Sequence, residues 1–204
     1  MSWINSCINL VFPSEFSDAF LTKIPPAPEP PHQYIFALYD YQNYYGKKLV
    51  YTIKKRQERS LSKKIAQRLC NLITEYLSEQ NMFGYFKNPI IIPVPLFKKD
   101  SHRDFNQIEL ISKYFANAVN GSYQPECLIK NIATQKQARI SNKKKRFQNV
   151  KNAFSVPEKY RQEIAGEDII IVDDLVTTGA TLLEIRKVLL VSGARNVIGI
   201  TIAH

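Results

Sequence analysis

The residues best suited to chemistry lie in one stretch, 169–182, which reads IIIVDDLVTTGATL. Four β-branched residues end in two adjacent carboxylates, Asp173 and Asp174. In an open parallel sheet, the carboxyl ends of the strands form the crevice where ligands bind. Two neighbouring carboxylates repel each other and resist loss of water, so a strand end tolerates them only where cations, hydroxyl groups or water satisfy them. Sugar hydroxyls and a hydrated Mg²⁺ both meet that need.

The residues that follow the acids predict an anion site. They supply hydroxyl donors and a small-residue backbone that enters a helix: Thr177, Thr178, Gly179, Ala180 and Thr181. Free N–H groups at a helix N-terminus, together with the helix dipole, bind phosphate. Carboxylates for a ribose and a cradle for a phosphate, a few residues apart, predict a ribose 5-phosphate site.

Three other structures account for parts of this segment. A phosphorylation receiver domain also places two acids after a buried strand, but most of its sheet follows them, and only 30 residues follow Asp174 here. A P-loop requires GxxxxGK[ST], which is absent from the sequence. A helix N-cap with a turn explains Thr177 or Asp174 alone, but not the whole string.

Apolar runs and helical periodicity alternate along the chain. This alternation predicts an α/β fold with a mainly parallel central sheet flanked by helices. Strands are expected at 34–39, 90–92, 169–172 and 197–202, and helices at 48–57, 61–83, 105–119 and 180–191.

The DDLVTTGAT string resembles the motif with which type I phosphoribosyltransferases bind phosphoribosyl pyrophosphate (PRPP). Further segments occur in the order and spacing of the ComF family of competence-associated proteins, and the resemblance covers roughly residues 34–204. These segments are Ile92–Leu96, Arg103–Gln107, Gln137, Arg146 and Asn149–Phe154.

The resemblance implies a division of roles in the site. Asp173 and Asp174 would hold the ribose 2- and 3-hydroxyls and water on Mg²⁺, and residues 177–181 would hold the 5-phosphate. Val94 and Pro95 would begin a loop near the pyrophosphate, with Arg103 as its charge partner.

Residues 134–153 are polar, basic and poor in apolar periodicity, which suits a mobile flap over the site. Gln137, Arg146 and Asn149 are the candidate flap residues, and Arg146 joins the two acids as a candidate catalytic residue. A solvated basic loop is the alternative for this segment.

Two departures from the family limit the inference. Asp104 stands where the family usually has glycine, so the loop conformation there can differ. Many members also carry an N-terminal zinc finger, but Cys7, Cys70 and Cys127 are isolated and form no CxxC pair. No zinc site is therefore expected, and the isolated cysteines suit a reducing cytoplasm.

The chain carries 28 Lys and Arg residues against 18 acidic ones, a formal charge of +10, which favours polyanionic partners such as nucleic acid. Tyrosines near these charges, at positions 41, 44, 45 and 51, could stack on bases, although packing is the commoner use of such residues. Helix-dipole pairing and a solvated loop are alternatives for the basic clusters. The candidate nucleic-acid residues are Lys54, Lys55, Arg56, Lys143, Lys144 and Lys145.

The N-terminal region is expected to stand apart from the main domain. Residues 1–31 are predicted to be a short helix followed by a Pro-rich linker, and residues 32–204 the phosphoribosyltransferase-like domain. No apolar run reaches the ~18 residues that span a bilayer, so we expect no membrane insertion and a cytoplasmic protein.

Three functions remain open at this point. The chain could be a PRPP-dependent transferase of nucleotide metabolism, a PRPP-binding sensor without turnover, or a competence protein that handles single-stranded DNA during uptake. In the third case, DNA-uptake proteins are possible partners.

Overall fold

The computed structural model describes residues 17–55, 58–79, 86–96, 107–132 and 142–204. Its centre is a five-stranded parallel sheet in the order β1–β7–β6–β2–β3. The strands are β1 (Ile35–Tyr39), β2 (Ile90–Pro93), β3 (Ser122–Tyr123), β6 (Asp168–Leu175) and β7 (Asn196–Ala203). The predicted fold class, an α/β domain with a parallel sheet between helices, is confirmed.

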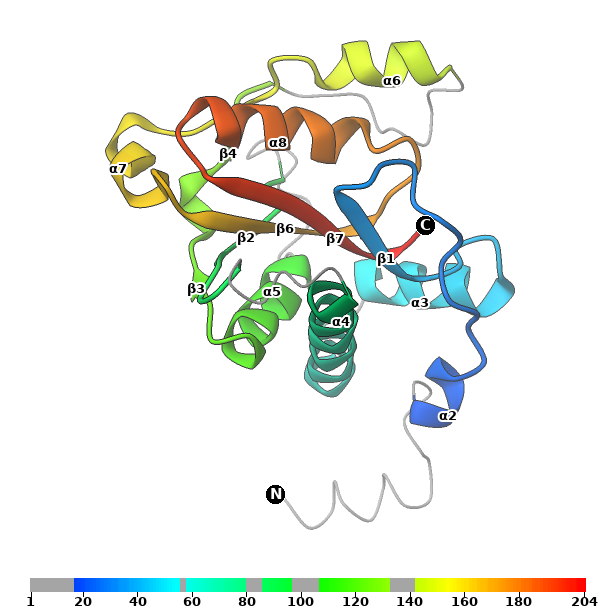
Figure 1. The fold of residues 1–204 in the computed structure, drawn as a ribbon. Coiled ribbons are helices and arrows are strands. Elements are labelled where there is room, and N and C mark those ends of the chain that lie inside the picture. The colour runs from blue at the N-terminus through cyan, green and yellow to red at the C-terminus, as the bar shows by residue number, and fades with distance from the viewer. Residues whose placement is uncertain (1–16, 56–57, 80–85, 97–106, 133–141) are drawn as a thin grey trace.

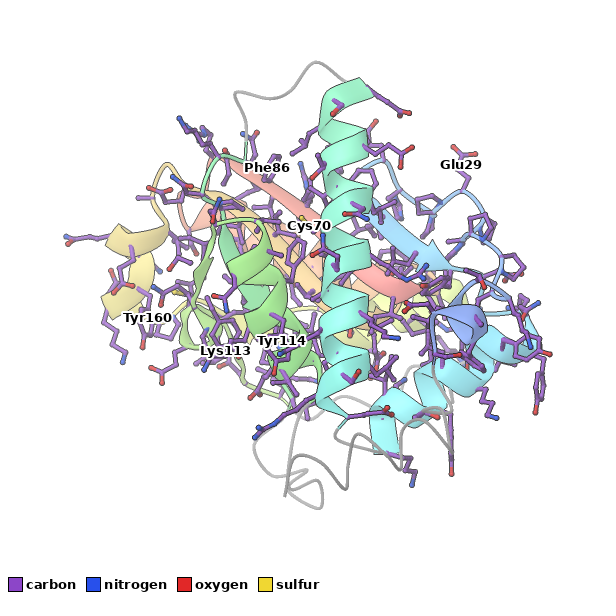
Figure 2. All side chains as sticks on the ribbon, turned by 90° about the horizontal axis from the view of Figure 1, so that it is seen from below. Glu29, Cys70, Phe86, Lys113, Tyr114 and Tyr160 are labelled. Carbon is purple, nitrogen blue, oxygen red and sulfur yellow. The ribbon has the colours of Figure 1, made fainter. Side chains whose placement is uncertain are left out.

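Helices cover both faces of this sheet (Figure 1). One face carries α8 (Ala180–Val191), and the other carries α4 (Arg59–Glu79) and α5 (Gln107–Ala118). Figure 2 shows α4 running across its face with Tyr114 of α5 beside it. A further helix, α3 (Tyr44–Lys55), lies near the ends of β6 and β7 and contacts both strands.

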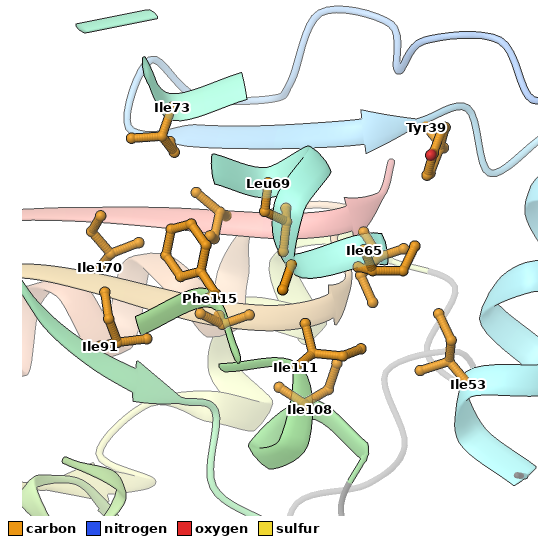
Figure 3. Packing of buried hydrophobic residues seen from close by; sticks show 14 of the residues in the cluster. Tyr39, Ile53, Ile65, Leu69, Ile73, Ile91, Ile108, Ile111, Phe115 and Ile170 are labelled. Atoms are coloured by element: carbon orange, nitrogen blue, oxygen red, sulfur yellow. The ribbon is translucent and has the colours of Figure 1, made fainter. Parts of the chain in front are cut away.

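Each face of the sheet has its own apolar core, because alternate residues of a strand point to opposite sides. Ile170 and Val172 of β6 pack with α4 and α5, whereas Ile169 and Ile171 pack with α8. Figure 3 shows the first of these cores, around Phe115. β6 is thus buried on both faces, which explains its uninterrupted apolar sequence.

The eight expected elements are all present, with shifted ends. β6 continues through both acids to Leu175, and α3 begins at Tyr44 rather than at residue 48. The elements that were not expected are short: α2 (Asp18–Leu21), η1 (Pro125–Cys127), β4 (Ile129–Lys130), α6 (Lys143–Val150), β5 (Phe154–Ser155), η3 (Glu158–Tyr160) and α7 (Arg161–Ile164), together with β3. All of them except α6, which has eight residues, span two to four residues and are too short to show a periodic pattern.

The described part of the N-terminal region packs on the sheet domain. Leu21 and Ile24 belong to the core shared with α4. The proline-rich segment is hydrogen-bonded to the end of β1, since Ala27 N donates to Leu38 O at 3.1 Å and Asp40 N donates to Pro25 O at 2.9 Å. Residues 25–27 therefore lie along an edge strand instead of forming a free spacer. The helix expected within residues 1–16 lies outside the described residues.

None of the helices in the described ranges is long and apolar enough to cross a membrane.

A buried carboxylate at the start of β6 ties three segments together. Asp168 is only 1% exposed, and it accepts hydrogen bonds from Arg195 (2.7 and 2.9 Å), Asn196 Nδ2 (2.8 Å) and Phe86 N (2.7 Å). Burial alone would raise the pKa of this carboxyl, but these donors outweigh burial and hold the pKa below its ordinary value. The arrangement is structural, because it lies at the opposite end of β6 from Asp173 and Asp174.

Asp168→Asn should lower the free energy of unfolding by about 2–3 kcal/mol at pH 7, because an amide loses the charge and turns a donor toward donors. A folded-state pKa below the unfolded value means that this stabilisation is present above about pH 4 and is lost as the pH falls further. Urea unfolding at pH 7 and pH 3.5 measures both effects. The exposed neighbour Glu167→Gln is the control, and equal stability of the two variants at pH 7 would contradict the assignment.

Candidate functional site

The two acids of β6 are consecutive residues at the carboxyl edge of the sheet. Asp173 is in register with Thr201 of β7, and Asp174 N donates a hydrogen bond of 2.8 Å to Asp173 Oδ1. Both side chains are partly buried. Both acids therefore lie at the carboxyl end of β6, the end at which open parallel sheets bind ligands.

A lysine from α3 neutralises part of this charge. Lys54 Nζ lies 3.1 Å from Asp174 Oδ2, and the two side chains are 32% and 21% exposed. Lys130, at the end of β4, is a second cation whose charge acts on Asp173. Sequence reasoning assigned Lys54 to a nucleic-acid surface and did not single out Lys130. Only the fold brings residues 54 and 130 to the end of β6.

Loss of water raises the pKa of Asp173 to about 7, and the neighbouring charge of Asp174 adds to the rise. The Asp174 N–H and the charges of Lys54 and Lys130 oppose it. Asp173 thus sits at the balance between protonated and ionised forms near neutral pH. A cation or a set of hydroxyl donors placed there would favour the ionised form.

The residues after the acids form the expected strand–loop–helix. Val176 N donates to Ala203 O at 3.0 Å, which ties the start of the loop to β7. Gly179 then adopts φ +75° as the N-cap of α8, and a glycine at this position supplies no side chain to cap the first N–H groups of that helix. These N–H groups, with the hydroxyls of Thr178 and Thr181, are donors available to an anion.

Close packing around the loop and a positive φ angle both require glycine at position 179. A Cβ at this position would lie 2.9 Å from both His32 Cδ2 and Ile35 Cδ1, and φ is positive. The glycine therefore lets the loop pack on residues before and within β1. A larger residue would collide with His32 and Ile35 and distort the loop.

A helical arm lies over this loop. Residues 143–150, expected as part of an irregular flap, form α6, which is capped by Asn142 Oδ1 accepting from Lys144 N at 2.8 Å. Arg146 Nη1 donates to Thr177 Oγ1 at 3.0 Å. Asn152 N donates to Glu184 Oε1 of α8 at 2.7 Å, which anchors the arm just after the helix.

The first turn of α6 carries exposed lysines, Lys144 and Lys145, at the end of the helix where the dipole disfavours positive charge. These two lysines therefore do not stabilise α6 through its dipole. They add positive charge to the arm, on which Arg146 contacts Thr177. Asn149 also makes contacts on this arm.

The loop expected near a pyrophosphate begins beside the acids. Val94 N donates to Val172 O at 2.9 Å, one residue before Asp173, and Pro95 follows. Arg103, Asp104, Gln137 and Arg56 lie outside the described residues. Of the other candidates, Lys55 is exposed at the end of α3.

The two acids fit a magnesium ion held largely through water. Within the described ranges, no cluster of three or more His, Cys, Asp or Glu residues forms a metal site. Mg²⁺ keeps several waters and accepts one or two carboxylates plus substrate oxygens, which is what Asp173 and Asp174 offer. Cys127 is fully buried, and burial raises the pKa of its thiol to about 11.

Comparison with known proteins gives curated relatives that match part of this chain. No family model matches the chain. The chain is 33% identical over 127 residues to the DNA utilization protein YhgH of Escherichia coli O157:H7, covering 62% of this chain and 54% of that protein. It is 34% identical over 108 residues to competence protein F of Haemophilus influenzae, covering 52% of this chain and 46% of that protein. The chain thus spans about half the length of the curated relatives it matches.

Solved structures show a weaker likeness. The allosteric regulatory enzyme of purine biosynthesis matches with a TM-score of 0.45 and 19% identity, over 75% of this chain and 30% of that chain. Glutamine PRPP amidotransferase from B. subtilis matches with a TM-score of 0.46 and 20% identity, over 74% and 30%.

Asp173→Asn should stabilise the protein at neutral pH, because the amide keeps the oxygen that accepts from Asp174 N but carries no charge. A folded-state pKa of about 7, above the unfolded value, means that ionisation costs stability as the pH rises from about 4 to about 7. We expect a gain of about 1 kcal/mol or more, or about 2–4 °C in Tm, at pH 8 and none at pH 4. Thermal melts at the two pH values test this, with exposed Glu75→Gln as the control. A variant less stable than wild type at pH 8 would show that ionisation of Asp173 does not destabilise the folded protein.

Proposed function

We propose that this protein binds PRPP or ribose 5-phosphate together with Mg²⁺ at the carboxyl edge of the sheet, and that it acts in DNA utilisation and the handling of single-stranded DNA. The observation that carries the first part is the continuous segment 173–181. It places two partly buried carboxylates and an uncapped helix N-terminus on one strand–loop–helix. The DNA role rests on the relatives named above and on the charge of +10.

Each part of the site has a defined task in this proposal. Asp173 and Asp174 accept hydrogen bonds from the ribose hydroxyls and from water on Mg²⁺. The first N–H groups of α8 and the hydroxyls of Thr178 and Thr181 bind the 5-phosphate. Bound Mg²⁺ would supply positive charge against the pyrophosphate oxygens.

Lys54 and Arg146 supply charge from the two sides of the site. Lys54 pairs with Asp174, and Arg146 donates to the hydroxyl of Thr177. An incoming phosphate offers Arg146 a charged acceptor in place of a neutral one, which forms a stronger hydrogen bond. The arm formed by α6 would then hold the ligand and exclude water.

Two versions of this function differ in turnover. Phosphoribosyl transfer needs positioning and electrostatic stabilisation rather than a nucleophile on the protein, so the site is chemically sufficient for a transferase. The same contacts also serve a sensor that binds PRPP without turnover. Release of pyrophosphate in the presence of a panel of bases identifies the transferase, and binding without release identifies the sensor.

Thr178→Ala should weaken PRPP binding in the presence of Mg²⁺ by about 1.5–3 kcal/mol, because it removes a hydrogen bond to a charged phosphate. Isothermal titration calorimetry measures the loss. Thr74→Ala, at an exposed position of α4, is the matched control and should bind like wild type. Gly179 is unsuitable for this test because a side chain there collides with His32 and Ile35. Wild-type affinity in Thr178→Ala would remove this residue from the phosphate site.

The double variant Asp173→Asn/Asp174→Asn should separate the two ligands. PRPP binding with Mg²⁺ should fall sharply, because the carboxylates that attract the ion and orient the ribose are lost. Affinity for single-stranded DNA should stay equal or rise slightly, because less negative potential opposes the strand. Fluorescence anisotropy with a labelled oligonucleotide gives the second value, and a parallel fall in both affinities would mean that one site serves both ligands.

A further inference from the structure

Helix α3 presents tyrosines and lysines to solvent along one stripe. Positions 44, 48, 51 and 55 follow the spacing i, i+4, i+7 and i+11, which places them on one face of a helix. Tyr44 is 70% exposed and Tyr51 is 65% exposed. The opposite face packs into the protein through Leu49, Val50 and Ile53. The exposed rings are therefore not needed to hold α3 in place.

Neighbouring cations and rings extend this stripe onto α2. Lys55 Nζ lies 5.9 Å from the centre of the Tyr51 ring, and Lys48 Nζ lies 5.9 Å from the ring of Phe20 in α2. The ring of Tyr45 makes edge contacts with Phe20 and with Tyr44, at centroid distances of 5.6 and 5.3 Å. The α2–α3 face is defined by the residues of α3 that line it, Tyr44, Tyr45, Lys47, Lys48, Tyr51 and Lys55, together with the buried ring of Phe20 in α2 on which Lys48 and Tyr45 pack.

The chemistry of the α2–α3 face matches a ligand that carries both flat rings and negative charges. Single-stranded nucleic acid is bound by aromatic side chains that stack on bases and by a positive groove that follows the phosphates. A membrane surface is a poorer match, because interfacial helices bury an aliphatic face in lipid and the aliphatic face of α3 is already buried in the core.

The C-terminal end of α3 lies beside the acid pair, because Lys54 Nζ is 3.1 Å from Asp174 Oδ2. The same helix therefore turns Lys54 toward the ligand site and its tyrosines toward solvent. From Tyr44 to Lys55 the stripe is about 16 Å long, at about 1.5 Å per residue. A strand lying along it would run up to Lys54 and the acid pair.

We propose that the α2–α3 face binds single-stranded DNA by stacking bases on Tyr44 and Tyr51, with Lys47 and Lys55 on its phosphates. This inference rests on the proposed DNA role and adds to it the surface and the mode of binding. It assigns the stacking energy to the tyrosines and the salt dependence to the lysines. It also places the DNA outside the ribose 5-phosphate site, so the two ligands use different residues.

Three double variants of the full chain test the proposal by fluorescence anisotropy with a labelled oligo(dT) at several salt concentrations. Tyr44→Ala/Tyr51→Ala should weaken binding about 10-fold or more, with an unchanged dependence on salt. Lys47→Ser/Lys55→Ser should weaken binding and reduce the slope of log affinity against log salt by up to about 1.4, or about 0.7 for each lost phosphate contact. Lys159→Ser/Lys187→Ser removes the same charge from exposed positions outside the α2–α3 face and should change little.

Each remaining outcome overturns the proposal. If the tyrosine variant binds oligo(dT) like wild type, the tyrosines do not stack on bases. If the two lysine variants lose the same affinity, the DNA is attracted by net charge alone and not by the α2–α3 face. Binding of wild type to phosphatidylserine vesicles but not to oligo(dT) would identify a lipid surface instead. PRPP calorimetry on the same variants keeps the two proposals apart, because a tyrosine variant that binds PRPP like wild type is folded, whatever its affinity for DNA.

Discussion

Two adjacent carboxylates at the end of a strand that is buried on both faces are the constraint on which this structure depends. Parallel pairing of β6 with β2 and β7 fixes the position of Asp173 and Asp174 at the end of that strand. Burial and mutual repulsion raise the pKa of Asp173 to about 7. A ligand that supplies positive charge or hydroxyl donors would offset this unfavourable burial of negative charge. Lys54 supplies a counter-charge to Asp174.

The surroundings of the acids follow from their place in the sheet. The chain that leaves β6 must turn into α8, and Gly179 makes that turn against His32 and Ile35 while leaving the first N–H groups of the helix uncapped. The arm with α6 brings Arg146 to the same turn. Negative charge at the strand end is thus bordered by donors and cations, an order that suits a ligand with hydroxyls at one end and phosphate at the other.

Much of the fold could be predicted from the sequence, because the buried strands of an α/β domain appear as apolar runs. The strand at 169–172, the helix at 180–191 and the place of the two acids between them follow from local pattern. The partner of Asp174 could not be predicted, since Lys54 lies 120 residues away and its place at the C-terminal end of α3 gave helix-dipole pairing as a sufficient explanation. Likewise, α6 has no apolar stripe, and its position depends on contacts such as that between Asn152 and Glu184.

The central claim, that residues 173–181 form a Mg²⁺-dependent ribose 5-phosphate site, is tested most directly by a crystal structure of the protein with PRPP and Mg²⁺. The account predicts the 5-phosphate on the N–H groups at the start of α8, the ribose hydroxyls at Asp173 and Asp174, and Lys54 moved from its position 3.1 Å from Asp174. PRPP bound elsewhere on the protein, or a loop that stays empty at saturating PRPP while Lys54 keeps its pairing, would contradict it.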